Sequence, residues 1–234
     1  MIDTNAISHT REQQSPQLRI AFLGDLSAND ASYARIIAGR TDQFFKAVRG
    51  LLAEQDLVVA NLEAAWDRGG ESPPIGPEGK IHIRTGPRIV EALRQLNVST
   101  VSFANNHSFD FGPQAWTTFK KIIAATGVQQ LGAGRNTQEA AQPLIHEQDG
   151  ITIGLLAYAD RECGAVYAST EKPGVNPFDV EQAVTEIKAL KSRVDHVVLL
   201  IHWGEERILL PSPKQRDWAR RLSAAGADIL IGHH

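Results

Sequence analysis

Short apolar runs alternate with amphipathic runs along this chain of 234 residues, from residue 17 to its end. The apolar runs are compact, as in LRIAFLG (18–24) and DHVVLLIHWG (195–204), which is typical of buried strands. The intervening runs carry apolar side chains at helical spacing, as in PRIVEALRQLN (87–97). Strands that alternate with helices of this length predict an α/β fold with a largely parallel core sheet.

The same pattern places the individual elements. We expect strands at 18–24, 56–63, 98–104, 142–150, 151–160, 195–204 and 228–234, with the fourth and fifth paired as a hairpin. Helices are expected near 42–54 and at 87–97, 112–127, 176–193 and 212–227. The last helix has the clearest start signal, because Ser212 precedes Pro213 and Gln215 stands in the capping-box position.

Composition restricts the classes of partner and the compartment. The net charge of −3, with scattered Lys and Arg, gives no electrostatic footprint for nucleic acid. Cys163 is the only cysteine, which excludes an intrachain disulfide and a thiolate metal cluster. No stretch approaches the roughly 18 apolar residues of a membrane span, and the polar N-terminus lacks the apolar core of a signal peptide. We therefore expect a flexible lead-in over 1–17, one domain over 18–234 and, for the chain as written, a cytoplasmic location.

Polar side chains follow five of the expected strands at their carboxyl ends. They are Asp25, then Asn61 and Glu63, then Asn105, Asn106 and His107, then His202, and finally His233 and His234. One such ending would be ordinary turn chemistry. Five polar strand ends are expected to meet in one cleft at a single sheet edge, which is where α/β sheets bind ligands. Carboxylate, amide and imidazole groups suit Mn, Fe, Zn or Mg, so the pattern predicts a metal site.

Five motifs occur in order along the chain: FLGD, VVANLE, SFANNHSFD, LIHWGEE and ILIGHH. Together with AYAD, GAGRN and KPGVNPFD, they make the chain resemble the bacterial capsule-synthesis and poly-γ-glutamate-synthesis (CapA) family. That family is similar to the calcineurin-like metallophosphoesterases and 5′-nucleotidases. The resemblance runs from about residue 18 to the end. It implies a four-layer α/β/β/α metallophosphoesterase-like sandwich with a metal centre at the strand ends.

The resemblance also implies roles for individual residues. The implied metal ligands, for one or two divalent ions (Mn, Fe, Zn or Mg), are Asp25, Glu63, Asn106, His202 and His233, with Asn61 as an alternative to Glu63 and His234 as an alternative to His233. His107 would protonate a leaving group, and Asp110 would orient it. Arg84 is a candidate for binding an anionic substrate, with an ordinary surface arginine as the alternative.

Two departures from the metallophosphoesterase pattern bear on the site. Those proteins open with Asp-x-His, whereas this chain has Asp25-Leu26-Ser27, so one metal position loses a strong ligand. They also continue past GHH with Pro-His and further strands, whereas the sequence here stops at His234. We therefore expect a domain that is incomplete at its C-terminus.

Three functions compete at this point. The first is a capsule or poly-γ-glutamate synthesis protein whose metal-dependent, phosphoesterase-like site hydrolyses an anionic substrate. The second is a non-catalytic component that binds an anionic polymer in a synthesis or export machine, which Ser27 favours. The third, an amidohydrolase barrel, is disfavoured by the paired strands and the Asn ligand. Members of the family are often membrane-anchored, and no such anchor is visible in this sequence.

Overall fold

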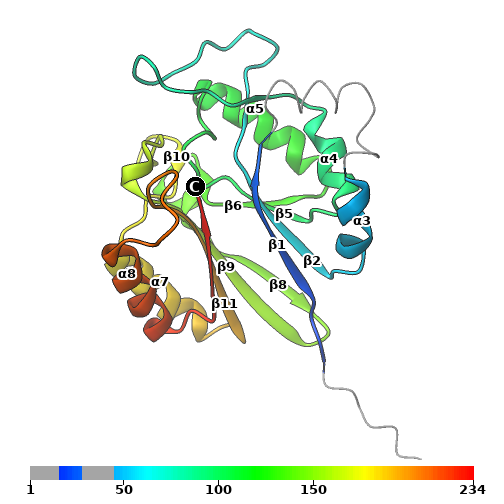
Figure 1. Cartoon of the computed structure of the whole chain (residues 1–234), viewed down its shortest axis with the longest axis vertical. Helices are drawn as coiled ribbons and strands as arrows, with labels where there is room; N and C mark the ends of the chain where they lie inside the picture. The colour runs from blue at the N-terminus through cyan, green and yellow to red at the C-terminus, as the bar shows by residue number, and fades with distance from the viewer. Residues whose placement is uncertain (1–15, 28–44) are drawn as a thin grey trace, which may run out of the picture.

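The computed structural model describes residues 16–27 and 45–234 and contains two facing β-sheets with helices on their outer sides (Figure 1). The first sheet has the order β1-β2-β5-β6, and all of its pairs are parallel. Its strands are β1 (Ile20–Leu26), β2 (Leu57–Leu62), β5 (Thr100–Ser102) and β6 (Gln129–Leu131). The second sheet has the order β12-β11-β9-β8. Its strands are β8 (Leu144–Gln148), β9 (Ile151–Ala159), β11 (His196–His202) and β12 (Ile229–His233), and only β8 is antiparallel to its neighbour.

Each sheet has its own set of covering helices. The first is covered by α3 (Lys46–Ala53), α4 (Ile89–Gln95) and α5 (Gly112–Ala124), and the second by α7 (Val180–Lys191) and α8 (Pro213–Ala225). The shorter elements are β3 (Ala65–Trp66), β4 (Arg84–Thr85), β7 (Ala133–Gly134), α6 (Thr137–Ala140), η1 (Arg161–Cys163) and β10 (Gly174–Val175). No helix in the described part of the chain is both long and apolar enough to cross a bilayer.

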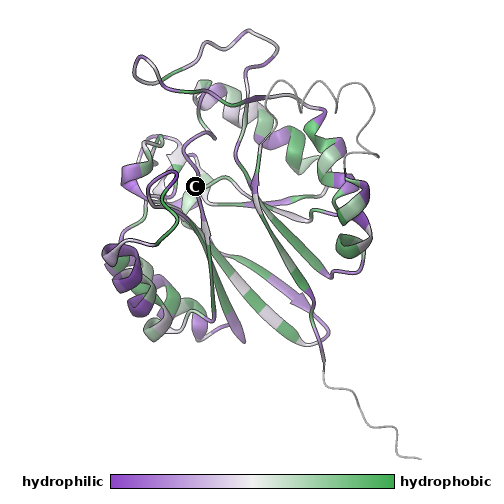
Figure 2. Cartoon of the chain, in the orientation of Figure 1, coloured by the Kyte–Doolittle hydropathy of each residue, from purple (hydrophilic) through white to green (hydrophobic). Residues whose placement is uncertain are grey.

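Alternating side chains on the strands create the layers. On β2, Val58 and Ala60 pack toward the helices of the first sheet, whereas Leu57 and Val59 pack into a separate cluster between the two sheets. On β9, Leu155 joins that central cluster and Leu156 packs under α7 and α8. Both faces of these strands are therefore buried, and Figure 2 shows their largely apolar colouring. The expected α/β/β/α sandwich is confirmed.

Most expected elements form close to their predicted bounds. The hairpin of β8 with β9 is present, and α8 begins with a reciprocal capping box between Ser212 and Gln215. The expected single sheet edge is wrong, because the polar strand ends belong to two facing sheets. β6 was not anticipated, since its QQL sequence carries little apolar signal. The lead-in expected over 1–17 lies outside the described residues except for its last two positions, as does the start of the helix expected near 42.

Small residues bring the two sheets together just below their carboxyl ends. Gly132 follows β6 and has a φ of +83°, which favours glycine. A Cβ atom added to Gly132 would lie 2.7 Å from Ala104 Cβ in the first layer and 2.9 Å from Ala157 Cβ on β9. Two non-bonded carbon atoms do not approach so closely in real proteins. The two sheets would therefore have to move apart to accommodate the methyl group of an alanine at position 132.

We expect Gly132→Ala to destabilise the fold by about 2–5 kcal/mol, which combines the cost of the left-handed backbone with that of overpacking. Gly127→Ala is the matched control, because Gly127 has a similar φ of +85° but open space around its Cα. Gly127→Ala should lower the free energy of unfolding by only about 1–2 kcal/mol. Denaturant unfolding of both variants gives the comparison, and equal losses would contradict a tight contact between the sheets.

Candidate metal centre

Three of the strand-end side chains meet where the two sheets face each other. Asp25, Glu63 and His202 offer ligand atoms that all lie within 4.8 Å of one another. The first sheet supplies the two carboxylates, from β1 and the end of β2, and the second supplies the imidazole at the end of β11. Glu63 and His202 are buried, whereas Asp25 lies at the exposed rim. Oxygen and nitrogen donors in this arrangement fit a divalent cation.

A β-bulge aims Asp25 into the cluster. The register of β1 on β2 shifts between Phe22 and Asp25, so that Asp25 lies opposite Asn61. Leu23 and Leu26 both pack on the helix side of the sheet, although regular alternation would place them on opposite sides. The extra residue in β1 therefore turns the Asp25 side chain toward the second sheet.

The charges of the cluster are unbalanced in the absence of a cation. Burial and the adjacent Asp25 carboxylate raise the pKa of Glu63 to about 8. Partial burial also acts to raise the pKa of Asp25, but the hydrogen bond from Asn61 and the proximity of His202 outweigh it and lower that pKa. Burial and the neighbouring His234 lower the pKa of His202 to about 3, so its imidazole is neutral and available as a ligand. A divalent ion would relieve the repulsion between the two carboxylates.

His202 is held by three side chains from the first sheet. Its Nε2 lies 2.9 Å from Asn106 Oδ1 and 3.6 Å from Glu63 Oε1. Its Nδ1 lies 3.3 Å from Asn61 Nδ2. Asn106 thus has its amide oxygen directed at the cluster, as its predicted ligand role requires. The same contacts fix the imidazole plane of His202.

Asn61 and Asn105 hold the carboxylate side of the cluster. Asn61 Nδ2 donates to Asp25 Oδ1 at 2.7 Å, while Asn61 Oδ1 accepts a hydrogen bond from Asn105 Nδ2. The amide oxygen of Asn61 is therefore engaged, and Asn61 positions Asp25 while Glu63 faces the cluster. Asn105 Oδ1 also accepts the backbone N–H groups of His107 and Ser108. The sequence placed Asn105 in the SFANNHSFD motif but did not predict that it would connect Asn61 to the turn that carries His107.

His107 and Asp110 form a buried pair at the edge of the cluster. His107 Nδ1 lies 2.7 Å from Asp110 Oδ2, and His107 Nε2 lies 3.8 Å from Glu63 Oε1. Asp110 also receives Lys80 Nζ at 2.8 Å and the backbone N–H of Ile83. Burial acts to raise the pKa of Asp110, but His107 and Lys80 outweigh it and lower that pKa. Lys80 ends the Gly- and Pro-rich segment 68–80, which lies in a loop, and was not predicted to take part.

The two terminal histidines point in different directions. His234 Nδ1 lies 3.1 Å from His202 Nε2, and the His234 backbone N–H donates to Asp25 Oδ2. His233 Nε2 instead lies 3.4 Å from the carbonyl oxygen of Leu23. The structure therefore brings the His234 side chain, rather than that of His233, against His202.

Cys163 joins this side of the centre unexpectedly. Its thiol and the imidazoles of His202 and His234 form a second group whose ligand atoms lie within 4.8 Å of one another. Burial and the nearby carboxylates, Asp160 foremost, raise the pKa of the Cys163 thiol to about 12. Composition correctly excludes a cluster of several thiolates, but a single cysteine beside two histidines could not be recognised from spacing.

Arg84 lies apart from these side chains. Its guanidinium contacts Asp67 at 3.0 Å and lies over the ring of Phe111, and its side chain is mostly exposed. It lines a separate hollow of about 550 Å³ together with Ser27 and His82. Its predicted role in substrate binding stays a prediction.

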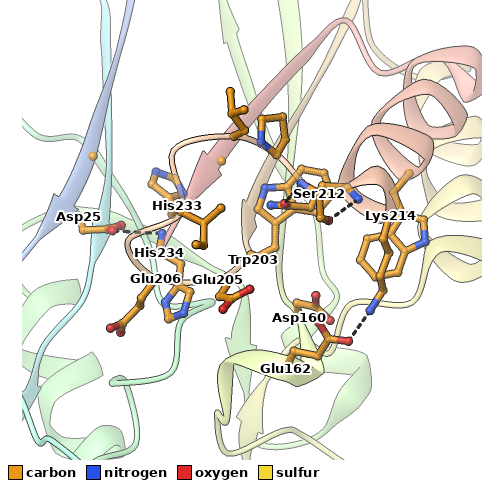
Figure 3. A pocket seen from close by; sticks show the side chains of 18 residues that line it. Asp25, Asp160, Glu162, Trp203, Glu205, Glu206, Ser212, Lys214, His233 and His234 are labelled. Atoms are coloured by element: carbon orange, nitrogen blue, oxygen red, sulfur yellow. Dashed lines mark hydrogen bonds and ion pairs between the residues drawn. The ribbon is translucent and has the colours of Figure 1, made fainter.

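A pocket of about 760 Å³ opens beside the metal ligands (Figure 3). Asp25, His233 and His234 lie at one end of it, and the start of α8 with Lys214 lies at the other. Trp203 and Trp218 stack on each other along one wall, with ring centroids 6.2 Å apart. The pocket is large enough for an organic ligand to reach the metal ligands from the side of the second sheet.

Solved structures with low sequence identity share this fold. A 5′-nucleotidase precursor from Thermus thermophilus superimposes with a TM-score of 0.54 at 16% identity, over 93% of this chain and 41% of that one. A phosphatase from Mycoplasma pneumoniae superimposes with a TM-score of 0.52 at 13% identity, over 93% of this chain and 64% of that one. These likenesses support the phosphoesterase-like architecture.

Relatives with higher identity come from capsule and polymer synthesis. The PGA biosynthesis protein CapA of Bacillus subtilis is 29% identical over 222 residues, which cover 93% of this chain and 57% of the relative. A probable polyglutamine synthesis accessory protein of Mycobacterium tuberculosis is 28% identical over 189 residues, or 76% of this chain and 49% of the relative. The chain thus spans about half the length of these relatives. The profile of the bacterial capsule synthesis protein PGA_cap matches residues 19–234, and the chain belongs to that family.

Proposed function

We propose that this domain is a metal-dependent hydrolase of the phosphoesterase type, serving capsule or poly-γ-glutamate synthesis. The proposal is carried by the convergence of Asp25, Glu63 and His202 within 4.8 Å at the facing strand ends. The relatives named for capsule and polymer synthesis support the biological setting. The fold shared with a phosphatase and a 5′-nucleotidase supports the reaction class by analogy.

In this proposal, one group of residues binds the metal ion and another transfers a proton. Asp25, Glu63 and His202 would hold a divalent ion, with Asn106 and His234 next to them. Such an ion supplies Lewis-acid chemistry, because it withdraws charge from the oxygens of the reacting group and activates water for attack.

His107 carries the proton in this proposal. Its Nδ1–H donates to the Asp110 carboxylate, which stabilises the imidazolium and leaves Nε2 facing the cluster. A proton held at Nε2 can pass to the oxygen of a leaving group. Asp110 is a positioning residue, since its buried carboxylate is engaged by His107, Lys80 and the backbone N–H of Ile83.

A non-catalytic component that binds an anionic polymer is the alternative. Ser27, which stands where related enzymes have a histidine ligand, favours it. The acidic lining of the pocket beside Asp25 argues against it, because a polyanion would be repelled there.

We expect His202→Ala to weaken binding of Mn²⁺ or Zn²⁺ by more than roughly 100-fold, since residues outside the coordination sphere already cost 10–100-fold. His196→Ala is the matched control, because His196 lies at the opposite, exposed end of the same strand. Elemental analysis and metal titration give the measurement. Absence of metal from the wild-type protein after loading with excess ion would overturn the catalytic proposal and leave the binding component.

We expect His107→Ala to retain its metal but to lose about 10²–10⁴-fold in kcat on an alkyl phosphate, the range for a lost general acid. The loss on p-nitrophenyl phosphate should be much smaller, because p-nitrophenolate leaves without protonation. Paired rate measurements on the two substrates test this role. Equal losses on both would assign His107 to structure rather than to proton transfer.

We expect Asp110→Asn to destabilise the protein by about 1.5–3 kcal/mol at neutral pH, the range for hydrogen bonds to a charged group. The pKa of Asp110 is lowered in the folded state, so its contribution is fully present above the ordinary value of 3.8 and is lost as the pH falls through the folded-state pKa. The unfolding free energies of variant and wild type should therefore converge below about pH 3.8. A difference in unfolding free energy between variant and wild type that persists at acid pH would rule out the ionised Asp110 carboxylate as its cause.

A further inference from the structure

The pocket beside the metal centre is strongly acidic. Among the described residues that line it, the carboxylates are Asp25, Asp160, Glu162, Glu205 and Glu206. Lys214 is the only Lys or Arg in this lining, and its Nζ is paired with Glu162 at 2.5 Å. The other four carboxylates also line the pocket (Figure 3), and none of them forms an ion pair with a Lys or Arg side chain among the described residues.

Asp160 is the decisive member of this group. It is only 5% exposed, yet among the described residues its side chain has neither a hydrogen bond nor an ion pair. Its backbone is fixed, since its N–H donates to the carbonyl of His202 at 2.8 Å and its carbonyl accepts from the Tyr167 hydroxyl. The Asp160 carboxylate lines the pocket with no partner from the described protein, so the pocket suits a cationic ligand with N–H donors.

The walls of the pocket indicate an organic cation. Trp203 and Trp218 form one wall, and Ile208 and Leu210 add apolar side chains at its mouth. The one ammonium group in the described lining, that of Lys214, lies 4.4 Å from the centre of the Trp218 ring while it pairs with Glu162. The pocket therefore already combines a carboxylate and an aromatic face around an ammonium group. A volume of about 760 Å³ exceeds what a bare metal ion requires.

We propose that this pocket binds a primary ammonium group of the ligand whose anionic group lies at the metal centre, with Asp160 as its main partner. Asp25 lines the pocket and also belongs to the metal cluster, so one ligand can reach both. This inference rests on the proposed function for the anionic end of the ligand. The inference predicts that the substrate carries a positively charged group in addition to its anionic group. That positive group would lie on the pocket side of the metal centre.

The test compares ω-aminoalkyl phosphates of increasing chain length with their N-acetyl counterparts, which lack only the positive charge. Binding is followed by tryptophan fluorescence, since Trp203 and Trp218 line the pocket. Titrations are made with and without Mn²⁺. We expect the best amine to bind about tenfold more tightly than its N-acetyl form, as for one desolvated, charge-assisted hydrogen bond.

Asp160→Asn should reduce this preference to near unity, because it removes the negative charge that would pair with the ammonium group. Glu206→Gln, an exposed substitution in the same pocket, should reduce the preference less. Glu147→Gln is the matched control: Glu147 is exposed on β8 and does not line the pocket, so the preference should be unchanged.

Equal binding of amine and N-acetyl forms by the wild type would overturn the inference, and so would a preference that survives both pocket substitutions. Absence of binding by either series would overturn it too. A second Mn²⁺ equivalent that is lost in Asp160→Asn and not displaced by amines would show that the pocket holds metal instead. The two proposals can fail separately. A preference for the amine that does not depend on Mn²⁺ would contradict only the proposed metal site. Binding that depends on Mn²⁺ but shows no preference for the amine would contradict only the proposed ammonium pocket.

Discussion

The metal cluster depends on two facing sheets whose parallel strands end at the same place. The first sheet brings the carboxylates and amides together with His107, and the second brings His202 and His234. Neither sheet alone holds a complete set of ligands. A dry layer of Leu and Val side chains fixes the spacing of the sheets, and Gly132 with its two alanine neighbours narrows it directly beneath the polar ends. The geometry of the centre is thus set by apolar packing below it.

The polar layer itself costs free energy, and the structure shows how that cost is offset. Buried amides and carboxylates are stable only when their donors and acceptors are matched. Asn105 does much of this matching, since it links Asn61 and the carbonyl of Leu62 to the turn that carries His107. The pair of Asp110 with Lys80 ties the long 68–80 loop to the same turn. Among the described residues, a few buried atoms such as Asn176 Oδ1 stay without a hydrogen-bond partner.

The sequence predicted the fold class and most of the strand-end residues because both follow from local patterns. The continuous burial of β2 and β9, which follows from their compact apolar runs, and the capping box of α8 can be read directly from the chain. The bulge in β1 was not predicted, although Gly24 stands within it and an isolated Gly inside a strand is a bulge signal. The choice of His234 over His233 as the neighbour of His202 depends on the last residues of β12 and on their long-range contacts.

Other residues were missed for a related reason. Lys80 lies in a loop, Asp160 directly follows β9 and Cys163 ends the short helix η1, and no spacing in the sequence marks any of them. Their significance comes from what folds against them: Asp110 for Lys80, the backbone of His202 for Asp160, and two imidazoles for Cys163. Such long-range partners are set by sheet topology rather than by nearby sequence.

The charge pattern of the site bears on how a polymer could approach it. A cation among Asp25, Glu63 and His202 would make that end of the pocket attractive to an anionic group, while Asp160 and Glu206 keep the adjoining space negative. A chain that repeats carboxylates along its length would be repelled from this space. A γ-linked glutamate chain carries a free ammonium group at only one of its ends. If the pocket selects an ammonium group, it would accept a chain of this kind only by that terminus.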